Sequence, residues 1–390
     1  MSQPESGVSA EKNRLQATSG NGAPGHSASG GAGVGSEPPQ SSGPPSMMPP
    51  SMQRVAVVVN GRAKNVTQEV ISTLDQILSG GDLFVSRSLA DAREIAKTLV
   101  VRGYDTVLTG GGDGTFTVMV TEIVREARRQ KARVPRLGLL KLGTGNALAW
   151  VVGASDFKGG EAEADIRRLT TELGSRPVRF VEVEGYITPF CGLGADAEVL
   201  NDYVKVKSAL GKTPLKRVAS GPVAYTVAAV TRSLPGYVFR RMPHCRVTNT
   251  GADAYRVGPK GSLVGRPIER GQVIYEGPMR LCALGTIPYF GYGFRVFPYA
   301  DERPDRMHLR VATISPAEFV GHFKSIWRGN YENPKSLFDF LVESVTIETD
   351  PAVGFQIGGD PFGTRSRVSA QLSPTTIQLV DFYAPPRADG

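Results

Sequence analysis

The sequence predicts an α/β domain followed by a β-rich domain, and three observations support this fold class. Short apolar runs alternate with segments of helical apolar spacing from Arg54 to about residue 177. Beyond that point, short β-type runs are separated by Gly and Pro. The 390 residues also exceed the roughly 100–200 that one domain usually takes. The predicted regions are a disordered tail at 1–52, the α/β domain at 53–177, the β-rich domain at 178–384 and a short tail at 385–390.

A strand followed by an amphipathic helix opens the α/β region. The apolar run at residues 55–59 precedes Val70, Ile71, Leu74 and Leu78, whose spacing is helical. Further strands of the same kind are predicted at residues 83–85, 106–108 and 137–140. Strands that alternate with helices predict a parallel sheet, and ligands of such sheets bind beyond the carboxyl ends of the strands.

Extended segments dominate the second region. Its β-type runs lie at residues 178–183, 279–284, 307–311 and 344–348. One helix is predicted at residues 225–234, packed on the surface of these strands. A β-rich domain is therefore expected after the α/β domain.

The opening 52 residues are dominated by Gly, Ser and Pro, a composition that buries too little apolar surface to fold. This tail is either a passive leader or a tether. The three cysteines and four histidines are dispersed, without Cys-x-x-Cys spacing, so neither a zinc site nor a disulfide framework is expected.

The formal net charge of +8 suits nucleic acid, anionic lipid headgroups or phosphorylated small molecules. Nucleic acid is not expected, because no basic motif has interleaved stacking aromatics. No run approaches the roughly 18 apolar residues that span a bilayer, so we expect a cytoplasmic protein with at most peripheral membrane contact.

A basic segment that surrounds an apolar one is the candidate for such contact. The apolar stretch is 223–230, and its basic neighbours are Lys205, Lys207, Lys212, Lys216, Arg217, Arg240 and Arg241. The arrangement fits either the inner face of an anionic membrane or an ordinary solvated helix face.

The segment 106–116 has the order strand, glycine turn, helix. Its turn, residues 110–115, reads Gly-Gly-Gly-Asp-Gly-Thr. Glycines let the backbone approach a ligand, and the amides at the start of the helix attract anions. Asp113 beside phosphates is reasonable if it helps to hold Mg²⁺, so the turn favours phosphoryl transfer. The alternative is a structural turn with a capping aspartate.

These residues and several others carry a resemblance to diacylglycerol kinases, sphingosine kinases and their bacterial relatives, a superfamily that includes NAD kinases. The chain resembles that family over roughly residues 54–382. The matching positions are Asn60, Ser86, the Gly-Gly-Asp-Gly-Thr at 111–115, the Leu-Gly-Thr-Gly-Asn at 142–146, the Gly-Leu-Gly-Ala-Asp-Ala at 192–197 and the glycine-rich stretch at 291–300.

The resemblance implies a nucleotide-binding α/β domain joined to a β-sandwich-like substrate domain, with ATP and Mg²⁺ in the cleft and a lipid hydroxyl as acceptor. Asp113 would organise Mg²⁺. Ser86 is equally well explained as an ordinary strand-end hydroxyl. The residues that would bind the nucleotide are Asn60, Ser86, Gly111, Gly112, Asp113, Gly114, Thr115, Gly143, Thr144, Gly145 and Asn146.

The family takes its catalytic base from an Asp-Gly-Glu motif near the C-terminus, and this chain has Gly-Gly-Asp at 358–360. Asp360 is accordingly the candidate base, with an ordinary turn aspartate as the alternative. Thr117 and Ala147 are further departures, since Asn and Asp are usual at these positions.

A second metal is the other implication of the resemblance, because Asp305 lies where bacterial relatives have an Asp-Gly pair near a structural Mg²⁺. Arg306 replaces that glycine here. Glu302 and Met307 would add backbone carbonyls. A solvated turn without an ion is the alternative.

Three functions remain open on the sequence: an ATP-dependent lipid kinase, an NAD kinase, and a catalytically silent lipid-binding relative. NAD kinases usually carry a later Asn-Glu motif, which is absent from this chain. The lipid kinase is therefore preferred. Neither the acceptor, which could be diacylglycerol-like or sphingosine-like, nor the oligomeric state can be read from the residues.

Overall fold

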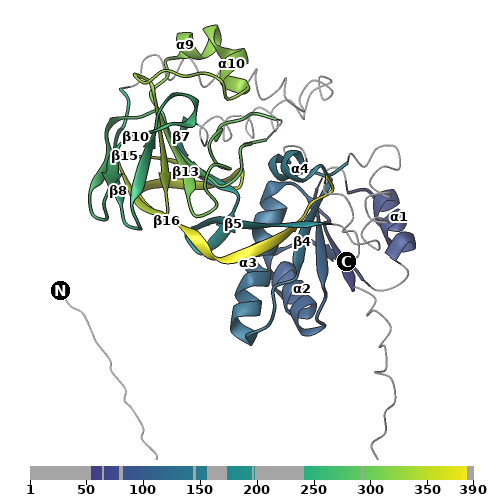
Figure 1. Ribbon diagram of the computed structural model, residues 1–390. Coiled ribbons are helices and arrows are strands. Elements are labelled where there is room, and N and C mark those ends of the chain that lie inside the picture. Colours follow the sequence, from purple (N-terminus) through teal and green to yellow (C-terminus); the bar gives the residue numbers. More distant parts are fainter. Residues whose placement is uncertain are drawn as a thin grey trace, which may run out of the picture. The chain divides into compact units, whose positions relative to one another are not determined.

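A computed structural model describes residues 54–63, 66–78, 82–143, 146–155, 174–195, 197, 241–291 and 293–383 (Figure 1). Several sequence predictions lie outside these residues: the N-terminal tail, the helix at 225–234, and the basic and apolar segment from Lys205 to Arg240. Thr144, Gly145, Asp196 and Tyr292 are outside them as well.

The strands and helices predicted in the α/β region are confirmed. In chain order they are β1 Val55–Asn60, α1 Gln68–Leu78, β2 Leu83–Ser86, α2 Leu89–Val101, β3 Thr106–Gly111, α3 Asp113–Gln130, β4 Arg136–Lys141 and α4 Ala147–Val152. The strands are parallel in the order β4-β3-β1-β2. Because β1 and β3 are buried on both faces, they read as continuous apolar runs rather than alternating ones.

The second region is β-rich, as predicted. Its strands are β5 Ser175–Val183, β6 Tyr186–Thr188, β7 Phe190–Gly194, β8 His244–Asn249, β9 Ala254–Val257, β10 Leu263–Ile268, β11 Val273–Pro278, β12 Leu281–Gly285, β13 Met307–Ala312, β14 Leu337–Val342, β15 Ser344–Ile357 and β16 Asp360–Val380. In the part of this region that the structure describes, short helices lie between strands at η3 Pro259–Gly261, α9 Pro316–Gly321 and α10 Phe323–Trp327.

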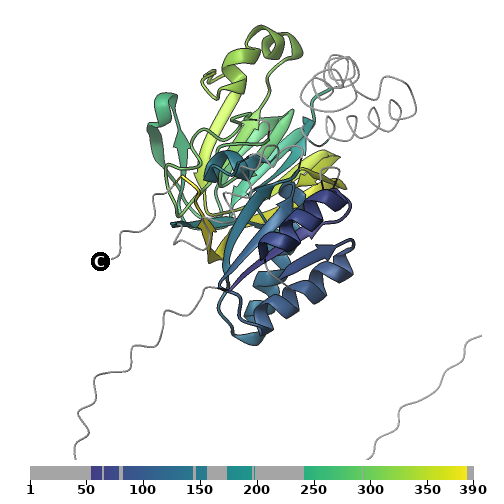
Figure 2. The same ribbon diagram turned by 90° about the vertical axis from the view of Figure 1, so that its right-hand side faces the viewer.

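The long strand β16 joins the two regions. Its first part pairs antiparallel with β15, and its last part runs parallel to β4, with Leu379 opposite Leu137. Figures 1 and 2 show this strand in yellow, crossing from the β-rich region to the parallel sheet. The strands thus form one hydrogen-bonded sheet path, and the sandwich form of the second region stays a prediction.

Two apolar cores support these layers. One lies around the parallel sheet and contains Val57, Leu108 and Phe116, and the other lies within the β-rich region and contains Val247 and Leu309. Among the described residues, no helix is both long and apolar enough to cross a membrane.

Candidate active site

The first glycine turn joins β3 to α3, as the sequence predicts. Gly112 is the N-cap of α3 and has an extended backbone. A Cβ on Gly111 would lie 2.5 Å from the Thr115 hydroxyl, so a side chain there would displace the first turn of the helix. The first amides of α3 have no intrahelical partner and carry the positive end of the helix dipole. The turn is therefore built to approach an anion closely.

The second glycine turn lies directly against the first. A Cβ on Gly143 would come within 2.2 Å of the Gly112 Cα atom, so the two backbones touch. Asn146 closes this turn in the left-handed conformation, with φ of 44°, and its amide donates to the Gly143 carbonyl at 2.7 Å. Among the described residues, the buried Asn146 Oδ1 has no hydrogen-bond partner.

The Asp113 carboxylate is hydrogen-bonded to the residues that follow the second turn. Its carboxylate accepts hydrogen bonds from the backbone amides of Ala147 at 2.8 Å and Leu148 at 3.3 Å, the first residues of α4. Burial raises the pKa of Asp113 to about 6, the two amides oppose this, and the nearby Asp360 adds to it. The predicted role with Mg²⁺ stays a prediction, since the structure gives this carboxylate a positioning role.

The raised pKa of Asp113 predicts a pH-dependent loss of stability. The folded protein holds the carboxyl proton of Asp113 more tightly than the unfolded chain does. The stability that this protonation contributes is therefore present below about pH 4 and is lost as the pH rises through about 6. Between pH 4 and 7 the wild type should lose about 3 kcal/mol of unfolding free energy relative to Asp113→Asn. Urea unfolding of both proteins, without nucleotide or Mg²⁺, measures the difference. The same pH dependence of the unfolding free energy in both proteins would contradict this prediction.

Asn60 and Ser86 lie side by side at the carboxyl edge, where β1 and β2 end in register. The Asn60 amide donates to the Thr115 hydroxyl at 3.0 Å, and its oxygen accepts from the Arg62 amide. Asn60 thus connects the end of β1 to the first glycine turn. The Ser86 hydroxyl donates to the Ser88 carbonyl, a bond that fits an ordinary strand-end residue.

Asp360, the predicted base, reaches the first turn of α3 from the start of β16. Its Oδ2 atom occupies the space above Gly114, where an added Cβ would lie only 2.1 Å from it. Although part of the residue remains exposed, many protein atoms surround the carboxylate, and this desolvation raises its pKa. The fold therefore brings Asp360 of β16 close to Asp113, at the first turn of α3.

Two departures from the family pattern meet in space. Gly358 has a left-handed backbone, with φ of 57°, and an added Cβ would lie 2.4 Å from the Thr117 hydroxyl. Thr117 and Thr188 share a hydrogen bond of 3.1 Å at this point. A side chain at 358 therefore does not fit beside this pair. The residue Thr188 was missed by sequence reasoning, since an isolated threonine gives no signal of its own.

Two arginines engage Asp305 where the second metal is predicted. The Asp305 carboxylate accepts from Arg303 at 3.2 Å and Arg306 at 2.6 Å, and Met307 is buried in β13. Glu302 is exposed. No cluster of three or more His, Cys, Asp or Glu side chains suited to a metal occurs in the described part of the chain. The second metal therefore stays a prediction.

Comparison with known proteins agrees with this geometry. The diacylglycerol kinase catalytic domain matches residues 54–177. Two curated proteins of Xanthomonas oryzae pv. oryzae, both named "Probable lipid kinase YegS-like", are 26% identical over 178 residues, which is 45% of this chain and 54% of theirs. The chain thus matches about half the length of these relatives. A solved diacylglycerol kinase from Bacillus anthracis str. Sterne has a TM-score of 0.52 at 16% identity, covering 85% of this chain and 98% of that one; this likeness concerns the fold.

Proposed function

We propose that this chain, whose residues 54–177 match the diacylglycerol kinase catalytic domain, is a lipid kinase that transfers the γ-phosphoryl group of ATP to a lipid hydroxyl. The observation that carries the proposal is the position of Asp360. Its carboxylate lies over Gly114, in the first turn of the helix whose free amides face the two glycine turns. A base beside a phosphate cradle is the arrangement that phosphoryl transfer to a hydroxyl requires.

The cradle fits a nucleotide with its metal. The first amides of α3 follow Gly112, which touches the turn at Gly143, and a site lined by bare backbone suits close approach by phosphate oxygens. The unpartnered Asn146 Oδ1 is an oxygen of the kind that Mg²⁺ or its water shell accepts. Asp113 would hold that turn in place and add negative charge nearby. ATP with Mg²⁺ would supply the transferable group and the charge that offsets its oxygens.

On the acceptor side, Asp360 would take the proton of the lipid hydroxyl as that oxygen bonds to the γ-phosphorus. The bond from phosphorus to the ADP oxygen breaks, and ADP leaves with that electron pair. Desolvation raises the pKa of Asp360, which strengthens it as a base. Above about pH 6, Asp113 is ionised as well. Activity should accordingly rise with pH on the acid side.

An apolar surface for the lipid body lies next to the second turn. Trp150 of α4 is 49% exposed and faces Tyr289, with ring centres 6.2 Å apart. A Cβ on Gly293 would lie 3.5 Å from the Trp150 ring, so the glycine-rich stretch reaches this tryptophan. We propose a diacylglycerol-like or sphingosine-like acceptor on this basis.

The test is phosphorylation by the purified chain, with ATP and Mg²⁺, of a panel holding diacylglycerol, sphingosine, ceramide, phosphatidylglycerol and NAD. A phosphorylated lipid whose formation is lost in Asp360→Asn supports the proposal and names the acceptor. Phosphorylation of NAD alone would replace it with the NAD kinase function. Binding of ATP without any product would favour a silent relative.

Gly112→Ala tests whether the cradle holds a nucleotide. Among the described residues, an added Cβ would meet only the Gly143 Cα atom within 4 Å, at 3.7 Å, and the backbone is extended. The fold should therefore tolerate the methyl group, whereas a phosphate pressed against the amides should not. We expect an unchanged melting temperature and ATP binding weakened about tenfold or more, measured by calorimetry. Unchanged affinity for ATP would place the nucleotide elsewhere.

A further inference from the structure

The helices α9 and α10 expose apolar side chains at the end of the β-rich region. Figures 1 and 2 show that the two helices lie beyond the ends of the strands. Val320 is 59% exposed and Phe323 is 37% exposed, one near the end of α9 and one at the start of α10. Single exposed apolar residues are common, so their surroundings decide whether they have a role.

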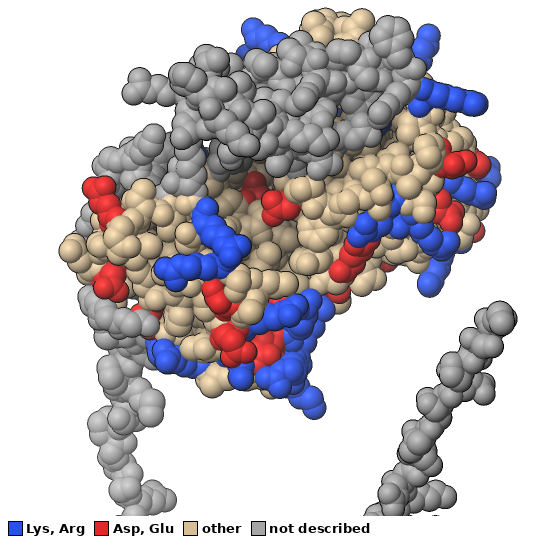
Figure 3. All heavy atoms as spheres, turned by 180° about the vertical axis from the view of Figure 1, so that it is seen from behind, with Lys and Arg blue, Asp and Glu red and all other residues tan. Residues whose placement is uncertain are grey.

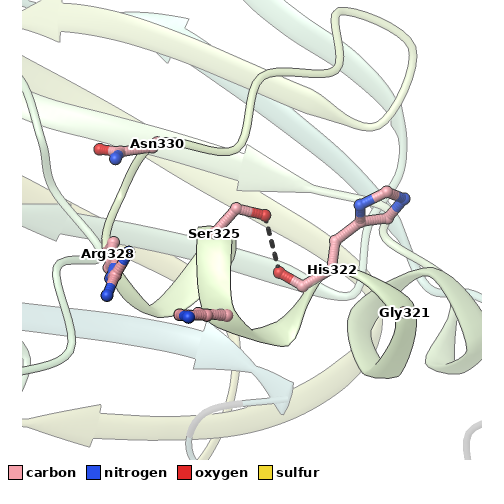
Figure 4. A pocket seen from close by; sticks show the side chains of 6 residues that line it. Gly321, His322, Ser325, Arg328 and Asn330 are labelled. Carbon is pink, nitrogen blue, oxygen red and sulfur yellow. Dashed lines mark hydrogen bonds between the residues drawn. The ribbon is translucent and has the colours of Figure 1, made fainter.

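Basic and polar side chains lie beside these two apolar residues. A shallow hollow of about 320 Å³ is lined by Gly321, His322, Lys324, Ser325, Arg328 and Asn330 (Figure 4). The Ser325 hydroxyl donates to the His322 carbonyl, which fixes the turn between the helices. Along the upper edge of the face in Figure 3, where these helices lie, Lys and Arg appear without acidic side chains.

The single acidic residue of the two helices, Glu318, is bound by side chains of the loop that follows α10. Glu318 accepts hydrogen bonds from Tyr331, Asn333 and Ser336. Although burial opposes it, these hydrogen bonds lower the pKa of Glu318 to about 2, so its carboxylate is ionised and engaged by three donors. The outer side of α9 and α10 is therefore apolar and positive.

Packing holds this surface in a fixed shape. Phe323 contacts Phe319 and Trp327, with ring centres 5.7 and 5.4 Å apart, and Trp327 stacks on Phe294 at 4.9 Å. Phe294 belongs to the glycine-rich stretch that also reaches Trp150. Ring contacts thus link the exposed helices to Phe294, and the neighbouring Gly293 lies against Trp150.

Strand β10 and the loop that follows it form the competing surface. Leu263 and Val264 are exposed there, 51% and 38%, near Arg266 and Arg270. Exposed Glu269 lies between the two arginines in the sequence, so this surface is of mixed charge. It lacks the one-sided charge that an anionic surface attracts.

We propose that α9 and α10 are the docking surface of this chain for an anionic phospholipid membrane. Val320 and Phe323 would enter the boundary between headgroups and acyl chains. Lys324 and Arg328 would contact lipid phosphates, with their stems along the apolar surface. None of these residues belongs to the kinase site, and docking requires no turnover.

Sedimentation of the full chain with vesicles tests the docking surface. Vesicles of pure phosphatidylcholine are compared with vesicles containing about 30% phosphatidylglycerol, a fraction chosen to give a negative surface potential. We expect binding to the anionic vesicles that weakens with salt. Val320→Ser with Phe323→Ser, and separately Lys324→Gln with Arg328→Gln, should each weaken partitioning about tenfold.

Matched control variants distinguish an effect of this surface from an effect of the protein's net charge. Leu263→Ser with Val264→Ser, and Arg266→Gln with Arg270→Gln, remove similar area and the same charge from the competing surface. These should leave partitioning within about twofold of the wild type. Thermal melting of every variant confirms that it is folded.

Tryptophan fluorescence gives a second readout. The chain has two tryptophans, so Trp150→Phe leaves Trp327 of α10 as the reporter. Brominated anionic lipids should quench Trp327. Absence of vesicle binding by the wild type, an equal loss in the control variants, or an unquenched Trp327 would each overturn the proposal.

Discussion

Gly143→Ala is expected to abolish detectable nucleotide binding at micromolar protein and to destabilise the fold. The new Cβ would lie 2.2 Å from the Gly112 Cα atom and 2.5 Å from its nitrogen. Both are backbone atoms at the junction of β3 with α3, so neither side can move without separating the two turns. Overpacking of this kind costs about 1–3 kcal/mol in stability. Calorimetry with ATP and urea unfolding measure the two effects.

Gly321→Ala is the matched control for that experiment. A Cβ there meets nothing within 4 Å, and the backbone of Gly321 is not left-handed. This variant should bind ATP and unfold like the wild type. If Gly143→Ala keeps both its stability and its affinity for ATP, the contact between the two turns does not build the site.

Asp360→Asn is expected to lower turnover by about 10²–10⁴ while ATP binding changes less than about threefold. The amide keeps the volume of the side chain over Gly114 but cannot take a proton at neutral pH. The effect should therefore appear in kcat and not in the affinity for nucleotide. Initial rates with saturating ATP and the identified lipid measure it, with binding followed separately by calorimetry.

Two further variants sharpen this result. Asp360→Glu keeps a carboxylate at the same place and should recover part of the lost rate, because the general base is restored. Asp253→Asn removes an exposed aspartate of the β-rich region and should leave turnover unchanged. An Asp360→Asn protein with wild-type kcat would show that Asp360 is a turn residue, the alternative that the sequence left open.

The two groups of departures from the family pattern have different structural consequences. Gly358 and Thr117 compensate each other, because the space that a side chain at 358 would need holds the hydroxyl of Thr117. Ala147 instead uses its backbone, whose amide donates to Asp113. These departures leave Asp113 in the first turn of α3 and the Asp360 carboxylate beside that turn. For this reason we favour an active kinase.

The amino-acid sequence alone determined the elements of the parallel sheet and the place of both glycine turns. Apolar runs such as residues 55–59 and glycines at the ends of β3 and β4 are local signals, so they can be read without the fold. The sequence also named Asp113, Asn60 and Asp360. Without the resemblance to a family, however, Asp360 is an unremarkable residue of a Gly-Gly-Asp-Pro turn.

Only the tertiary structure decided which of these residues meet. Asp360 lies over Gly114 because β16 pairs first with β15 and then with β4, and no local pattern encodes that pairing. No local pattern predicts that Asp113 accepts hydrogen bonds from the start of α4, or that Val320 and Phe323 lie on the outside of α9 and α10. Periodicity reports which face of an element is apolar, whereas the partner of that face depends on contacts between residues far apart in the chain.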